Sequence, residues 1–193
     1  IPTSVTSIGT GVFGGCTSLT TIEVETMNAQ YKSISGVLYN KNGNELIQYP
    51  SGNTSTTYSI PTYVTTLKDK SFYQNSKLYE IIFNDNLQNV GESAFEGVSN
   101  IRSITIKSNM TSIGKNAFGS MNLLNSFVYL GTTTPTCSDD IFTGSSLLNK
   151  VYTKIENTEL TTFCQKTCEN TINSNGECGT TMKYITTNKN ELI

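Results

Sequence analysis

The chain has 193 residues, a formal net charge of −2 and only 15% charged side chains. It contains no histidine, which excludes a Ser-His-Asp triad, a Cys-His pair and a histidine-ligated metal. Without a basic excess, nucleic-acid binding is not expected, and no apolar run is long enough to predict a transmembrane segment.

A repeat with a period of about 23 residues dominates the sequence, and periods of this order are typical of stacked repeat architectures. The phenylalanine anchors Phe72, Phe95 and Phe118 are evenly spaced by this period, and Phe142 follows with nearly the same spacing. Phe13 precedes Phe72 by one period plus a long insertion. Apolar residues recur eight and five positions before each of the first four anchors, and six and nine positions after every anchor. A unit this short predicts one strand, a turn and a compact back segment, which stack into a solenoid over residues 1–153.

The first unit, residues 1–24, predicts a short strand at its end, where Ile22 and Val24 alternate with polar residues. The chain opens with Ile1-Pro2, so we interpret it as a fragment or a processed form. With no cap at this end, Ile1, Val5 and Ile8 would lie exposed. We therefore expect that self-association through the uncapped N-terminal end is possible.

The inserted segment, residues 25–59, has the pattern of a β-hairpin. Val37–Tyr39 and Glu45–Tyr49 predict two strands, and Asn42-Gly43 is a favoured turn between them. The segment is therefore either a wider repeat or a hairpin elaboration of the solenoid. Asn53 and Asn109 begin N-x-S/T sequences and are candidate glycosylation sites, although a chain rich in Asn, Ser and Thr also produces such sequences by chance.

Side chains that alternate with the buried ones would form two solvent-facing rows across the parallel sheet. We predict that both rows bind a partner. Large apolar residues in the central row favour a contact surface, whereas β-forming residues that merely suit a strand are the alternative. The central row is Glu23, Ile82, Thr105, Val128 and Tyr152, and the flanking row is Thr21, Glu80, Ser103, Ser126 and Lys150.

Two other functions are conceivable for this face. Rows of threonine and serine leave glycan binding open. Glu23 and Glu80 on adjacent strands would resemble the carboxylate pair of a glycosidase. An open sheet has no desolvated pocket to separate the pKa values of two carboxyl groups, so we predict no catalytic residue, no metal and no cofactor.

The tail, residues 154–193, departs from the repeat and is predicted to cap the C-terminal end of the solenoid. Thr158 to Cys168 suits a short helix with Thr158 as N-cap. Disulfides among four cysteines would staple this segment, with three connectivities open. A zinc site is the weaker alternative, because the C-x3-C spacing fits it poorly. The four candidates are Cys137, Cys164, Cys168 and Cys178.

The first unit, IPTSVTSIGTGVFGGCTSLTTIEV, closely resembles the repeat of the BspA-like leucine-rich-repeat family, also called the Treponema pallidum type. Later units keep the Ala-Phe pair at Ala94-Phe95 and Ala117-Phe118, whereas the cysteine of the family survives only at Cys16. The resemblance marks Cys16 as a structural filler. The segment from Tyr31 to Pro50 is similar to one that is common in this family.

The resemblance implies a leucine-rich-repeat solenoid with a parallel β-sheet on the concave face and short irregular, turn or 3-10 segments on the convex face. It further implies a non-enzymatic adhesion protein, either secreted or at the cell surface. The implied partner is a host cell-surface or extracellular-matrix protein of the fibronectin or fibrinogen type. Fold alone does not fix function, so a structural spacer and a glycan-binding module remain alternatives.

Overall fold

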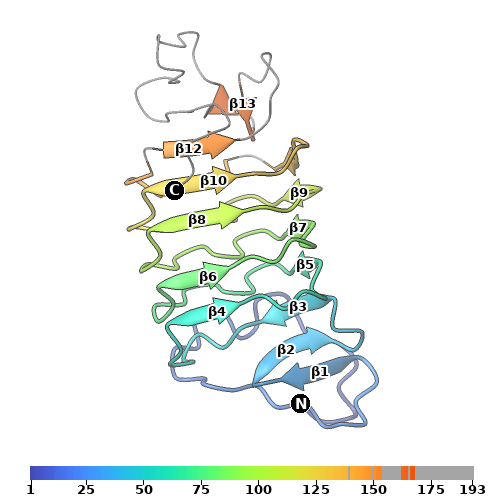
Figure 1. Ribbon diagram of the computed structural model, residues 1–193. Coiled ribbons are helices and arrows are strands. Elements are labelled where there is room, and N and C mark those ends of the chain that lie inside the picture. The colour runs from blue at the N-terminus through green and yellow to red at the C-terminus, as the bar shows by residue number, and fades with distance from the viewer. Residues whose placement is uncertain (139, 149, 154–161, 165, 168–193) are drawn as a thin grey trace, which may run out of the picture.

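A computed structural model of the chain describes residues 1–138, 140–148, 150–153, 162–164 and 166–167. The regular elements of these residues are short β-strands, and the chain winds through them in successive turns to form a solenoid (Figure 1). This confirms the predicted fold class. The part of the chain that the structure describes holds no helix with the length and hydropathy of a membrane span.

Parallel strands lie one above the other along one side of the solenoid (Figure 1). We call the solvent-facing side of these strands the ladder face. The pairing follows the repeat, since Thr57 lies opposite Glu80 and Ser103 lies opposite Ser126. The strands are β4 (Thr57–Ser59), β6 (Glu80–Ile82), β8 (Ser103–Ile106), β10 (Ser126–Tyr129) and β12 (Lys150–Thr153).

A second sheet runs along another side of the solenoid and joins the same repeats. Its parallel strands are β3 (Glu45–Gln48), β5 (Thr66–Leu67), β7 (Asn89–Val90), β9 (Ser112–Ile113) and β11 (Thr136–Cys137). At its N-terminal edge, β1 (Tyr31–Ile34) and β2 (Val37–Asn40) pair antiparallel with one another, and β2 pairs antiparallel with β3. The predicted hairpin is therefore confirmed, and a further strand lies on its outer side.

The back segments of the repeats are turns that bond directly to one another. The amide of Phe72 donates to the carbonyl of Ala94 at 2.8 Å, and the amide of Phe95 donates to the carbonyl of Ala117 at 2.8 Å. The phenylalanine rings stack inside, with centroids 4.9 Å apart for Phe72 and Phe95 and 5.4 Å apart for Phe95 and Phe118. The core is thus one column of rings that passes through every complete repeat.

Tyr49, not Phe13, is the ring that precedes Phe72 in this column. Its ring stacks on Phe72 with centroids 5.2 Å apart, and its amide donates to the carbonyl of Ser71 at 2.8 Å. The predicted anchor at Phe13 is therefore wrong for the column. The reason is that the inserted segment supplies a repeat of its own, in which β3, Tyr49 and β4 occupy the place next to β5 and β6.

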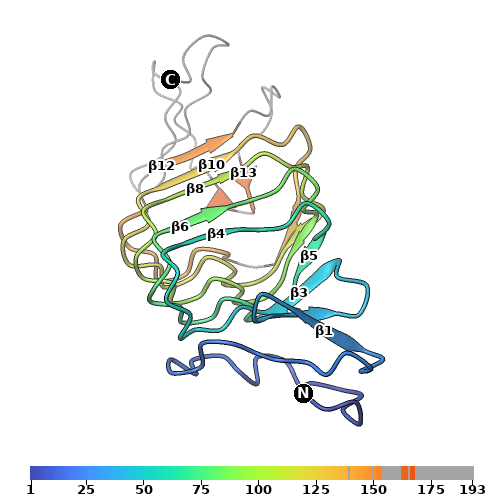
Figure 2. The ribbon, with the colours of Figure 1, turned by 60° about the horizontal axis from the view of Figure 1, so that its bottom comes forward.

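The first repeat packs loosely as an outer layer (Figure 2). The predicted strand at Ile22–Val24 is absent, because the β1–β2 turn bonds to this segment instead: Gly36 accepts from the Ile22 amide at 2.8 Å, and Ser33 Oγ donates to the Ile22 carbonyl at 2.5 Å. Ile1, Val5 and Ile8 are half-buried rather than fully exposed. The Cys16 side chain is exposed with a free thiol, so the role of structural filler that the resemblance implied is wrong.

The C-terminal end carries a second small hairpin. β13 (Thr162–Phe163) and β14 (Lys166–Thr167) pair antiparallel, and Cys164 has a φ of 55° at the turn. The predicted helix from Thr158 to Cys168 is wrong where this segment is described, because β-forming residues pair across the turn instead. Cys164 forms a disulfide with Cys137 on β11, whereas Cys168 and Cys178 lie outside the described residues. Most of the predicted cap, residues 154–193, also lies outside them.

Candidate functional site

The ladder face brings together most of the residues predicted for its central row. Thr105 on β8 lies opposite Val128 on β10, and Val128 lies opposite Tyr152 on β12. Ile82 on β6 is 49% exposed, Thr105 is exposed and Val128 is half-buried. The flanking row has the same order, with Glu80, Ser103, Ser126 and Lys150 on successive strands.

Glu23 and Thr21 do not belong to these rows. Their places are taken by Ser59 and Thr57 on β4, which lie opposite Ile82 and Glu80. Both Ser59 and Thr57 are exposed. Sequence reasoning missed them, although counting one period back from Ile82 and Glu80 reaches them directly. The segment that contains Glu23 is instead bonded to the β1–β2 turn.

This arrangement removes the carboxylate pair considered from the sequence. The neighbour of Glu80 across the ladder is Thr57, whose hydroxyl donates to Glu80 Oε2 at 3.4 Å. Across the described residues, no three side chains of His, Cys, Asp or Glu gather as metal ligands would. The ladder face therefore offers hydrogen bonds and apolar contact to a partner.

A hollow marks the boundary between β6 and β8. β4 and β6 form one sheet while β8, β10 and β12 form another, although the second sheet joins the same two repeats through Thr66 and Asn89. The ladder pairing is thus interrupted on the ladder face alone. The side chains that line the hollow combine one exposed apolar residue with charged and amide groups, and they include Glu80, Ile82, Asn84, Asp85, Thr105 and Lys107.

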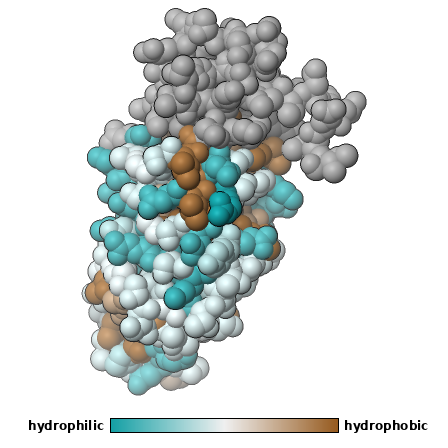
Figure 3. Space-filling model, turned by 90° about the vertical axis from the view of Figure 1, so that its left-hand side faces the viewer, coloured by the Kyte–Doolittle hydropathy of each residue, from teal (hydrophilic) through white to brown (hydrophobic). Residues whose placement is uncertain are grey.

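The flank where the ladder strands begin is mainly polar, with separate apolar patches between the polar side chains (Figure 3). Tyr79, directly before β6, is 62% exposed. Exposed apolar residues are therefore not confined to the ladder face. The exposure of Ile82 alone does not mark a binding site, and the residues around it have to be considered as well.

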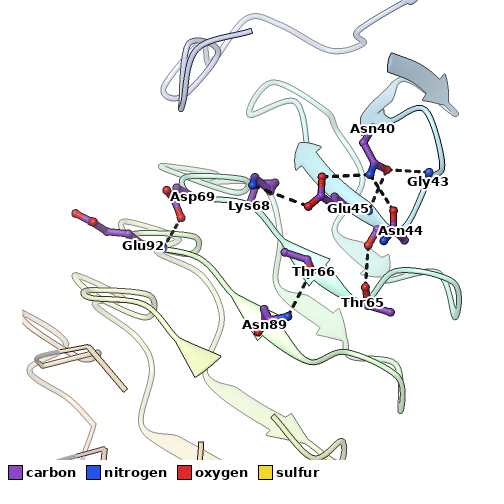
Figure 4. Close-up of polar contacts among 10 residues, drawn as sticks. All are labelled: Asn40, Gly43, Asn44, Glu45, Thr65, Thr66, Lys68, Asp69, Asn89 and Glu92. Carbon is purple, nitrogen blue, oxygen red and sulfur yellow. Dashed lines mark hydrogen bonds and ion pairs between the residues drawn. The ribbon is translucent and has the colours of Figure 1, made fainter. Parts of the chain in front are cut away.

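A polar cluster, which the sequence did not reveal, fixes the β2–β3 turn (Figure 4). Asn40 Oδ1 accepts from the amides of Gly43 at 2.8 Å and Glu45 at 3.1 Å, and Asn40 Nδ2 donates to Glu45 Oε2 at 3.1 Å. Glu45 Oε1 also forms an ion pair with Lys68 Nζ at 4.0 Å. The cluster holds a carboxylate on β3 and an ammonium group directly after β5, two neighbouring strands of the second sheet.

Two tyrosines, the buried Tyr39 on β2 and the half-buried Tyr58 on β4, meet in the N-terminal half of the core. The Tyr39 and Tyr58 hydroxyls share a hydrogen bond at 2.6 Å. Burial raises the pKa of Tyr39 to about 12, and burial also raises the pKa of Tyr58. Both phenols are therefore protonated at neutral pH, which suits a structural role rather than proton transfer.

The two candidate glycosylation sites lie in different surroundings. Asn53 is half-buried, and its Oδ1 accepts from the amide of Ser55 at 2.9 Å. Asn109 is exposed, and its Oδ1 accepts from the amide of Thr132 at 2.6 Å. Modification of either residue stays a prediction.

Comparisons with known proteins agree with this architecture. The chain matches the family described as "BspA type Leucine rich repeat region" in six copies, over residues 1–57 and 49–172. No curated protein matches the chain. Among solved structures, a leucine-rich repeat protein from Eubacterium ventriosum is 33% identical with a TM-score of 0.70, over 79% of this chain and 41% of that one.

Two further structures extend the comparison. A leucine rich cell surface protein from Faecalibacterium prausnitzii is 26% identical with a TM-score of 0.56, over 77% of this chain and 45% of that one. The pneumococcal vaccine antigen PcpA is 24% identical with a TM-score of 0.60, over 82% of this chain and 45% of that one, and it shows the fold alone. The chain thus spans less than half the length of each of these structures.

Proposed function

The chain belongs to the BspA-type leucine-rich-repeat family, and from this membership we propose that it is a non-enzymatic adhesion module, displayed at a cell surface or secreted. Its ladder face binds a host cell-surface or extracellular-matrix protein, of which fibronectin and fibrinogen are the examples to test first. One related structure is described as that of a cell surface protein, which supports the location.

The observation that carries this proposal is the placement of Ile82. It is a large apolar side chain, 49% exposed, in a row with Thr105 and the half-buried Val128. It also lines the hollow at the interrupted boundary between β6 and β8. A partially buried apolar residue ringed by polar side chains is the usual centre of a protein contact, since the surrounding polar groups exclude water and fix orientation.

The test compares the purified protein with the double variant Ile82→Asp, Val128→Asp. Binding to host cells and to immobilised fibronectin and fibrinogen is measured by surface plasmon resonance, with folding checked by circular dichroism. Loss of an interface centre weakens binding by roughly thirtyfold or more. The matched control is Met27→Asp, because Met27 is 82% exposed and lies outside the ladder face. Equal binding by the double variant and the control would exclude the ladder face.

The same experiment separates the alternatives. A structural spacer would bind none of these targets, with or without the substitutions. A glycan-binding ladder face would lose binding when the target protein is deglycosylated, whereas a protein-binding face would keep it.

The first repeat supports a second proposal, self-association at the N-terminal end. Val5 and Ile8 are half-buried, whereas the residues at the same positions of the repeat that contains Phe72, Val64 and Leu67, are fully buried. A second copy that covers this end would complete their burial. Sedimentation velocity over a hundredfold dilution checks this: a Val5→Asp variant should stay monomeric where the unmodified protein associates. A monomer at every concentration would refute the proposal.

A further inference from the structure

A second hollow lies between the first repeat and the second sheet, on a different side from the ladder face. It has a volume of about 310 Å³, within the range of small-ligand sites. Ile8, Val12 and Phe13 line it from the first repeat, and Ile47 and Gln48 line it from β3. It shares no lining residue with the ladder strands.

One residue of the first repeat that lines the hollow, Gly9, has open space beside it. Gly9, Gly91 and Gly114 occupy the same position of the repeat. A β-carbon added at Gly91 would lie 2.5 Å from the Asp69 amide nitrogen, and one at Gly114 would lie 2.5 Å from the Glu92 amide nitrogen. A β-carbon added at Gly9 would meet nothing within 4 Å. The contacts of Gly91 and Gly114 are both made to the preceding repeat, whereas the space beside Gly9 is open.

A buried glutamine in the wall of this hollow has an acceptor oxygen that accepts no hydrogen bond from the part of the chain that the structure describes. Gln48 is only 2% exposed, and its Nε2 donates to the carbonyls of Tyr49 at 3.0 Å and Ser71 at 3.1 Å. These two bonds fix the orientation of the amide, and no hydrogen bond from the described residues reaches Gln48 Oε1. An amide oxygen held in this way favours a ligand that brings an N–H or O–H donor.

The charges around the hollow decide the class of ligand. The Lys68 ammonium is already paired with Glu45 at 4.0 Å, and Asp69 adds a second carboxylate to the lining. An anionic ligand would therefore meet net negative charge. A purely aliphatic ligand would leave Gln48 Oε1 buried without a donor. The lining also offers amides from Gln30 and Asn40 and an apolar wall that includes Phe13.

We propose that this hollow binds a neutral sugar ring, a hexose or an N-acetylhexosamine. The C–H face of the ring packs on Ile8, Phe13 and Ile47, while a hydroxyl donates to Gln48 Oε1 and others reach the polar rim. The hollow thus gives the module a carbohydrate site that is separate from the protein-binding ladder face.

The test uses saturation-transfer difference NMR with glucose, galactose, mannose, N-acetylglucosamine and N-acetylgalactosamine as probes. At least one should bind saturably with a Kd of about 1 mM, the affinity expected for a ligand of this size. The variant Gly9→Phe places a ring in the open space, and it should weaken binding at least about tenfold without unfolding the protein. The matched control Gly9→Ala should bind within about twofold of the unmodified protein.

Three results would overturn the proposal. One is the absence of saturable binding for all five sugars. Another is unchanged binding by the folded Gly9→Phe variant, and the third is tighter binding of glucose 6-sulfate than of glucose. The Ile82→Asp, Val128→Asp variant should keep its sugar binding, so failure of the ladder-face proposal and failure of this one are measured separately.

Discussion

Replacing Phe95 with alanine should cost far more stability than replacing Phe13, although both residues occupy the same position of the repeat. Phe95 is fully buried, with its ring stacked between Phe72 and Phe118 and tilted against Phe83. Its removal loses the transfer free energy of the ring and leaves a cavity in the column, which together cost about 3–5 kcal/mol of unfolding free energy.

Phe13 has much less to lose. It is half-buried beside a hollow, and no ring contact within the described residues joins it to the column. Partial burial and the lack of a new closed cavity reduce the expected cost of Phe13→Ala to about 1 kcal/mol.

Urea unfolding followed by circular dichroism measures both variants, with Phe95→Leu as a control that keeps most of the volume and should cost less than about 1.5 kcal/mol. Repeat proteins can unfold in steps, so agreement between far-ultraviolet circular dichroism and tyrosine fluorescence should be checked first. Equal costs for Phe13→Ala and Phe95→Ala would refute the reasoning, because they would place Phe13 inside the column.

Three other predictions follow from contacts described above. Gly114→Ala should cost about 1–3 kcal/mol, because its β-carbon would overlap the backbone of Glu92 in the preceding repeat. Gly9→Ala should change stability by less than about 0.5 kcal/mol, and equal shifts in Tm for the two variants would contradict this reasoning. Burial raises the pKa of Tyr39 to about 12, so the neutral phenol contributes its full stabilisation below pH 10, and the unfolding free energy falls by roughly 2–3 kcal/mol between pH 10 and 12. Tyr39→Phe should therefore make the urea midpoint fall less steeply over that interval, and an equally steep fall would argue against this reasoning. Reduction of the Cys137–Cys164 disulfide, whose cysteines are 27 residues apart in the chain, should lower the unfolding free energy by about 3–4 kcal/mol. An unchanged urea midpoint after complete reduction would show that the disulfide does not constrain the unfolded chain.

The repeat made most of the solenoid predictable from sequence. Each unit buries the same positions against its neighbours, so the spacing of Phe72, Phe95 and Phe118 already implied a continuous core and parallel strands. The register of the ladder face followed from the same spacing, because one period separates Ser103 from Ser126 and places them opposite one another. Contacts between residues far apart in the sequence could be predicted here because the same local pattern recurs in every repeat.

Most of the wrong predictions concern residues 1–24, the repeat that precedes the inserted segment. The motif in residues 1–24 matches the repeat so closely that it was aligned with the unit at Phe72, and Tyr49 was overlooked as the ring that lies between them. The same choice placed Glu23 on the ladder face. Local similarity could not show that the β1–β2 turn bonds to Ile22 and holds this unit out of the sheet.

The weak signals failed for a different reason. A helix at Thr158 to Cys168 relied on an N-cap and on propensity, which tertiary contacts readily override. Neither hollow could be predicted, because the spacing of the repeat indicates which residues contact one another and not where neighbouring segments leave space between them.

The bonding between back segments has a mechanical consequence for a protein that is pulled from its ends. Because each repeat is held mainly by its two neighbours, tension along the axis would load the repeats in series and release them one at a time. A freed repeat of about 23 residues extends to about 75–80 Å, whereas it occupies only about 5 Å of the stack. Each release would therefore lengthen the tether by roughly 70 Å. The boundary between β6 and β8, which lacks ladder pairing on one side, is where the first release should occur.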